Sequence, residues 1–244
     1  MAKQHGLGMD LLIGGYRLGN DVGSISNMSS PVGQQVVTGL DKSAFERICL
    51  LRDGMMSFEP FFNPDEDRIH EVLSALPRGD LIVSALVGTA QGAPVYSLSG
   101  KQNNYDGSRG ADGALTFATT MTGNGWGADW GEILSEGITT STAAEDLTSV
   151  DGAAASAFGL QAYLHLIDFD GTDIDVVIED SADNATFLPI TGAAFTTATA
   201  IGAERIHTAR DGAVRRYTRV AVSGTFTTAT YVVAVNRNVA VAPL

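Results

Sequence analysis

The sequence predicts a mainly β protein, in which a β-sandwich or barrel with one packed α-helix precedes a second, small β-sandwich of jelly-roll type. Three observations predict this class. Glycine is abundant, with 28 in 244 residues, and turn signals separate short apolar runs. One segment alone has the apolar spacing of a helix face. After residue 158, the apolar runs have the length and alternation of strands.

The single helix is expected over residues 63–76. Asn63 is a suitable N-cap residue and Pro64 suits the first helical position. Acidic residues follow in the first turn, where the helix dipole favours negative charge. The apolar positions of this segment have the spacing i, i+3, i+4, i+7: Ile69, Val72, Leu73 and Leu76.

Strands are expected on both sides of this helix. A single helix flanked by strands favours a sandwich or barrel with the helix on one side. The apolar runs that predict the strands before residue 139 are 9–15, 36–37, 55–62, 80–88, 93–99, 113–121 and 130–134.

The chain is expected to divide into a first domain at 1–138, with an N-terminal arm at 1–31, and a C-terminal β-sandwich at 158–244. The segment 139–157 is rich in Ala, Ser, Thr and Asp without a clear period, which indicates a linker or surface loop. Asp-Gly at 170–171 and Ser-Gly at 223–224 predict turns between strands of the second domain.

The composition excludes several classes of function. Asp and Glu number 28 against 15 Lys and Arg, a formal net charge of −13, so a surface that grips nucleic-acid phosphates is not expected. No apolar run is long enough to span a membrane. Cys49 is the one cysteine, which excludes an internal disulfide framework. Its apolar neighbours indicate a small buried side chain.

No group of residues predicts an enzyme, a cofactor or a metal. The four histidines are far apart, and no phosphate-binding loop is present. The weak candidate for calcium is an acidic cluster whose glycine is out of register for a calcium loop, so an acidic hairpin turn is favoured. Five arginines at 205–219 resemble an anion site, but pairing with nearby carboxylates is favoured. The acidic cluster consists of Asp168, Asp170, Asp173 and Asp175.

The order of several segments resembles the major tail proteins of long-tailed bacteriophages, especially those that infect actinobacteria. The resemblance covers about residues 9–135. Its carriers are Leu51-Arg52-Asp53-Gly54-Met55-Met56-Ser57, the lone helix after it, Gly100-Lys101-Gln102, and Asp112-Gly113-Ala114-Leu115-Thr116. The second half resembles a β-sandwich appended to many such proteins, through Val177-Ile178-Glu179-Asp180 and Val214-Arg215-Arg216-Tyr217.

The resemblance implies a structural virion protein, made in the host cytoplasm, whose hexameric rings stack into a tail tube. Its partners would be further copies, other tail proteins, and DNA that passes through the channel without specific binding. An acidic wall suits such passage. The N-terminal arm and the polar loop 105–112 would become ordered on stacking. The residues expected at subunit interfaces are Leu11, Ile13, Tyr105, Asp106, Arg109, Trp126 and Trp130, with a core position favoured for the two tryptophans.

Two alternatives stay open. One is a capsid-decoration protein with the same sandwich, which leaves the first 135 residues unexplained. The other is a carbohydrate-binding β-sandwich, in which aromatic side chains would form the sugar platform. The aromatic residues of the second half are dispersed and include no tryptophan, which weakens the second alternative.

Overall fold

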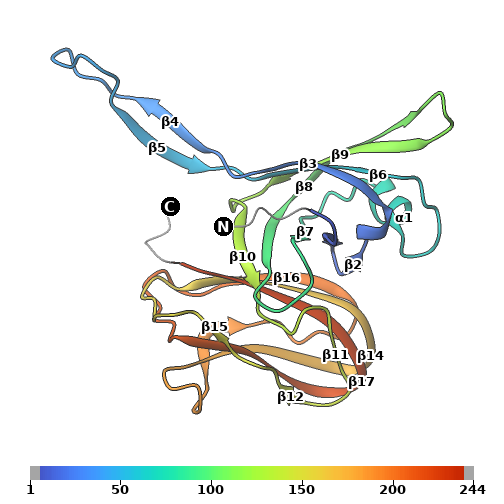
Figure 1. Ribbon diagram of the computed structural model, residues 1–244, viewed down its shortest axis with the longest axis vertical. Coiled ribbons are helices and arrows are strands. Elements are labelled where there is room, and N and C mark those ends of the chain that lie inside the picture. Colours follow the sequence, from blue (N-terminus) through green and yellow to red (C-terminus); the bar gives the residue numbers. More distant parts are fainter. Residues whose placement is uncertain (1–5, 239–244) are drawn as a thin grey trace.

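The computed structural model describes residues 6–238, and these form two lobes (Figure 1). The prediction of a mainly β protein is confirmed, because a single antiparallel sheet of 15 strands runs through both lobes. Its main path is β15-β14-β17-β10-β8-β7-β1-β2. No helix within the described residues is long and apolar enough to cross a membrane.

The first lobe contains two layers of strands around a core. The core includes Leu11, Phe58, Tyr96 and Met121, each at most 1% exposed. Its strands and its 3-10 turn are β1 (Asp10–Ile13), β2 (Tyr16–Arg17), η1 (Gly19–Asp21), β3 (Val22–Ser29), β6 (Met55–Pro60), β7 (Leu81–Leu86), β8 (Pro94–Arg109), β9 (Leu115–Gly123) and β10 (Asp129–Ile133).

The N-terminal segment differs from the expected arm. Residues 10–29 lie in the body of the lobe, because β1 pairs with β7 and β3 pairs with β6. The apolar side chains of β1 are buried and fix the strand in the sheet. Residues 1–5 of the expected arm lie outside the described residues.

The helix is shorter than the sequence predicts. α1 covers Ile69–Ser74, and Asn63 does not cap it. The Asn63 amide donates to Asp21 Oδ1 at 2.9 Å, and its oxygen accepts from the backbone N–H of Asp65 at 3.2 Å. Asp67 has a positive φ of 58°, which is incompatible with a continuous helix from residue 63. Ile69 and Leu73 are buried in the first core, as their spacing predicts.

Two hairpins project from the first lobe in opposite directions (Figure 1). One is the arm, formed by β4 (Val32–Val36) and β5 (Arg47–Arg52), which make a separate two-stranded sheet. The other is the far half of β8 and β9, paired from Tyr105↔Thr119 to Arg109↔Leu115. The segment 105–112, expected as a loop ordered on stacking, is therefore mostly strand within one chain.

The second lobe is built on two long strands, β14 (Leu160–Ser181) and β17 (Tyr217–Arg237), which pair along almost their whole length. The turns expected at Asp170-Gly171 and Ser223-Gly224 are absent. The pairing register shifts around Gly171, and Gly224 has a φ of +126° with its Cα against the backbone of Asp173. These glycines bend two continuous strands because bulges and close backbone contacts require them there.

Residues 139–157 are also different from the expectation of a linker or loop. Three short strands from this segment pair with β17 and complete the sheet edge. β14 pairs with two further strands at its other edge. These five strands are β11 (Thr139–Ser141), β12 (Glu145–Asp146), β13 (Val150–Asp151), β15 (Leu188–Ala194) and β16 (Gly202–His207).

The two lobes are joined by β10, which pairs with β8 on one side and β17 on the other. The run Tyr231–Val235 on β17 is buried on both faces. Tyr231, Val233 and Val235 face the core of the second lobe, whereas Val232 and Ala234 pack against Leu12 and Leu86 of the first lobe and its neighbours. A continuous apolar run is typical of a strand covered on both faces.

Candidate functional site

The arm carries apolar side chains on a hairpin that the rest of the described chain does not cover. All residues of β4 and the first five of β5 are exposed. Eight of the sixteen exposed large apolar residues in the described chain lie between residues 32 and 51. They are Val32, Val36, Val37, Leu40, Phe45, Ile48, Leu50 and Leu51.

These apolar groups occupy both faces of the arm. Side chains alternate along a strand, so Ile48 and Leu50 share one face of β5 while Cys49 and Leu51 share the other. Cys49 is exposed, contrary to the buried position that its neighbours predict. An isolated two-stranded hairpin is marginally stable in water, and neither face of this one is polar throughout.

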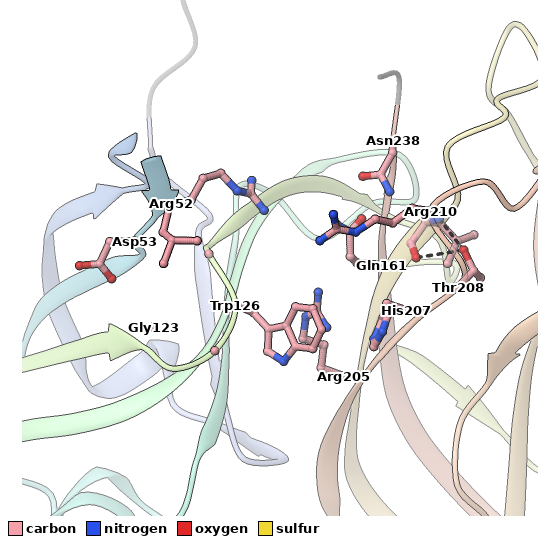
Figure 2. A pocket seen from close by; sticks show the side chains of 14 residues that line it. Arg52, Asp53, Gly123, Trp126, Gln161, Arg205, His207, Thr208, Arg210 and Asn238 are labelled. Carbon is pink, nitrogen blue, oxygen red and sulfur yellow. Dashed lines mark hydrogen bonds between the residues drawn. The ribbon is translucent and has the colours of Figure 1, made fainter. Parts of the chain in front are cut away.

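A cleft of about 250 Å³ lies between the lobes, beside the base of the arm (Figure 2). The first lobe contributes the end of the arm and the turn between β9 and β10. The second lobe contributes the start of β14, the end of β16 with the residues that follow it, and Asn238 after β17. The polar and aromatic side chains that line the cleft include Arg52, Trp126, Gln161, Arg205, His207 and Arg210.

Arg52 is held at the cleft by a buried carboxylate. Its Nη2 donates to Asp129 Oδ1 at 3.3 Å, and the Tyr163 hydroxyl donates to Asp129 Oδ2 at 2.7 Å. Asp129 belongs to the first lobe and Tyr163 to the second, so this contact joins the lobes. Burial raises the pKa of Tyr163, and the nearby Asp129 adds to that shift.

Arg205 and Trp126 form the floor of the cleft. The Arg205 guanidinium carbon is 4.1 Å from the centroid of the Trp126 ring, and Arg205 Nε donates to the Tyr163 hydroxyl at 3.2 Å. His207 approaches the same tryptophan, with 4.7 Å between ring centroids. Partial burial lowers the pKa of His207, and Arg205 and Arg210 lower it further.

A second polar contact joins the lobes at greater depth. His165 Nε2 is 3.0 Å from the Ser84 hydroxyl, which is 2.7 Å from the Ser97 hydroxyl. Burial lowers the pKa of His165 to about 3, so this side chain is neutral at pH 7. The sequence predicts a surface or partly buried histidine, whereas it is 1% exposed. We call Ser84, Ser97, Asp129, Tyr163 and His165 the seam.

The structure separates the residues expected at subunit interfaces. Leu11 and Ile13 are 1% and 0% exposed in the first core and do not reach the surface. Trp126 and Trp130 are 42% and 50% exposed, although a core position was favoured for them. Tyr105, Asp106 and Arg109 lie together on the β8–β9 hairpin, where the Tyr105 ring stacks on Phe117.

The weak calcium candidates are spread along β14. Asp173 accepts from the backbone N–H of Thr225, and Asp175 accepts from the Thr197 hydroxyl. Asp168 and Asp170 lie on the other side of the register shift at Gly171. Among residues 6–238, no group of three or more His, Cys, Asp or Glu side chains is arranged to hold a metal ion.

The arginine cluster of the C-terminal half divides in two. Arg215 pairs with Asp180 and Arg219 with Glu179, both at 2.7 Å, which confirms the prediction of internal pairing. Arg216 pairs with Asp151, and its guanidinium lowers the pKa of that carboxyl to about 2. Arg205 and Arg210 instead line the cleft.

Comparisons with known proteins find similar solved structures. No family model and no curated protein matches the sequence. The Dit protein of phage SPP1, described as a paradigm of the hub adsorption apparatus in phages that infect Gram-positive bacteria, is 12% identical, covers 94% of this chain and 99% of its own, and has a TM-score of 0.33. Two structures of the phage p2 baseplate in its activated conformation, with Sr and with Ca, are 10% and 12% identical, cover 94% of this chain and 98% of theirs, and have TM-scores of 0.33 and 0.31. TM-scores this low do not establish a shared fold, so nothing is inferred from these likenesses.

Proposed function

We propose that the protein is a non-enzymatic structural subunit of a long-tailed phage, which assembles with further copies into hexameric rings that stack as a tail tube. The observation that carries this proposal is the exposed apolar arm of residues 32–51. The resemblance of residues 9–135 to major tail proteins supports the same role.

The arm requires a partner because its apolar surface is otherwise in water. A contiguous exposed apolar patch marks an interaction surface in a soluble protein. The arm extends well beyond the body of its own lobe (Figure 1), so a second copy is within its reach. We infer that it lies on a different surface of the next copy. Such a head-to-tail contact closes into a ring when the rotation between copies allows it.

The charge of the chain supports a channel for DNA. The formal net charge is −13, and a ring of six copies multiplies it. A wall of like charge to the phosphates offers no adhesive contact, so that DNA slides rather than binds. In this arrangement the second lobe faces outward from the tube, and other tail proteins contact the ends of the stack.

The test is the assembly state of the purified protein, measured by sedimentation velocity and negative-stain electron microscopy. The double variant Leu40→Asp/Phe45→Asp places charge at two strongly exposed apolar positions of the arm, 110% and 70% exposed. We expect rings and stacked tubes from the wild type and monomers from the variant, since buried unpaired charge opposes association.

The matched control is Leu188→Asp, which changes an apolar residue of the second lobe that is 52% exposed. We expect this variant to assemble as the wild type does. Single rings without stacks would support ring formation but contradict stacking into a tube. A wild-type monomer at every concentration, or equal loss of assembly in the control, would reject the role of the arm.

A further inference from the structure

We propose that the cleft between the lobes binds an oxyanion group, a phosphate or a carboxylate, between the guanidinium groups of Arg52 and Arg210. Arg52 ends β5 in the first lobe, and Arg210 follows β16 in the second. Figure 2 shows the two side chains pointing toward one another across the cleft.

The charges at the cleft are unbalanced. Three arginines line it, and Asp53 is the one acidic residue among the described lining residues. Figure 2 shows the Asp53 carboxylate turned away from the gap, and it accepts from the backbone N–H of Gly54. Two like charges that face each other repel. An anion between them replaces this repulsion with two attractive contacts.

Arg210 is the arginine that is available to such a ligand. Arg52 donates to Asp129, and Arg205 is stacked on Trp126 and donates to Tyr163. Arg210 has no hydrogen bond or ion pair within residues 6–238, and it is exposed at the rim of the cleft. Its planar guanidinium suits the two oxygens of a carboxylate or phosphate.

Gln161 contributes an amide to the lining of the cleft. It lines the same cleft and is only 7% exposed, yet its side-chain oxygen has no hydrogen-bond partner. Buried polar side-chain atoms are normally paired. The NH₂ group of an amide is a donor and suits an oxyanion in the cleft, whereas the unpaired oxygen is an acceptor and does not attract one.

The size and walls of the cleft fit a small anionic group. Its volume of about 250 Å³ is several times the roughly 30 Å³ that one water molecule occupies. The Trp126 ring forms part of the floor, and an apolar surface strengthens the attraction between an anion and the guanidinium groups because it excludes water. The ligand would connect the base of the arm to the second lobe.

Two sources supply this chemistry, a phosphate group in solution and a carboxylate side chain of a neighbouring copy. The test titrates the full chain with inorganic phosphate and, separately, with acetate, and follows the Trp126 indole N–H by NMR. The proposal predicts saturable shifts with at least one of them. Saturation by phosphate alone assigns the site to a phosphate group, and saturation by acetate assigns it to a carboxylate.

The variant Arg210→Gln removes the available charge without removing any hydrogen bond of the fold. We expect its dissociation constant to rise roughly tenfold or more, the usual loss for a charge-assisted hydrogen bond. Arg78→Gln removes an equal charge from an exposed position that does not line the cleft and should leave binding unchanged. Equal binding by Arg210→Gln and the wild type, or no saturable shift with either anion, would overturn the proposal. The site lies within one chain, so this result is separate from that of assembly.

Discussion

The arm and the seam place opposite kinds of side chain in unusual surroundings. The arm holds apolar residues in water, with Phe45 70% exposed and Leu51 74% exposed. The seam holds polar residues out of water, with Ser84, Asp129 and His165 at most 3% exposed. The serines, carboxylate and tyrosine of the seam have partners within the chain, whereas His165 Nδ1 is buried without one.

The seam and the arm differ in whether the chain itself supplies contacts for their side chains. A buried polar group without a hydrogen bond destabilises the fold, and folding alone supplies such bonds to the two serines, the carboxylate and the tyrosine of the seam. The exposed apolar side chains of the arm are not covered by other residues of the described chain. The seam therefore contributes to the stability of one chain, whereas the apolar side chains of the arm gain no such burial within it.

The largest effect on stability is expected from the seam variant Asp129→Ala. It removes the acceptor of both Arg52 and Tyr163, so two donors between the lobes lose their partner. We expect the free energy of unfolding to fall by about 2–3 kcal/mol, measured by chemical denaturation. The matched arm variant Asp41→Ala should cost under about 0.5 kcal/mol, because Asp41 is 77% exposed. Equal costs would remove the distinction between the two regions.

His165 should make the contribution of the seam to the free energy of unfolding depend on pH. Its folded pKa is about 3, below the ordinary value near 6.5, so the unfolded chain binds a proton first as pH falls. The contribution of neutral His165 to the free energy of unfolding is therefore fully present above about pH 6.5. It decreases as the pH falls toward 3, with a slope of up to about 1.4 kcal/mol per pH unit. The variant His165→Gln should lack this part of the slope in denaturation measured from pH 4 to pH 7. Parallel curves for the two proteins would contradict the assignment.

The smallest effect is expected from Phe45→Ala in the arm. The ring contacts the exposed Arg47 at 5.3 Å and belongs to no core cluster, so the free energy of unfolding of the dilute monomer should change by less than about 0.5 kcal/mol. Assembly should weaken in the same variant, as sedimentation at increasing concentration would show. A large loss of stability would mean that the arm packs against its own chain.

The sequence predicts elements best where local signals determine them. The runs 80–88, 113–121 and 130–134 overlap β7, β9 and β10, because alternation and turn signals are local. The turn predicted at Asp170-Gly171 is wrong because distant residues, and not local signals, determine the structure there. The same dipeptide serves a tight turn or a bulge, and the choice depends on pairing with β17 more than 50 residues away.

The functional surfaces are less accessible to such reasoning. The apolar residues around Cys49 predict a buried side chain, and this is wrong because the hairpin that carries them projects from the lobe and leaves them exposed (Figure 1). Arg52, Trp126 and Arg210 meet only through the packing of the lobes. The excess of arginine at 205–219 is the one local signal, and only part of that cluster lines the cleft.

The position of β10 has a mechanical consequence. Its ladder bonds to β8 and β17 make the connection between the lobes a piece of sheet rather than a flexible tether. To swing one lobe about the other, the molecule would have to break backbone hydrogen bonds on at least one side of this strand. A force on the second lobe is therefore transmitted through β10 to the sheet of the first lobe, and the two lobes move together.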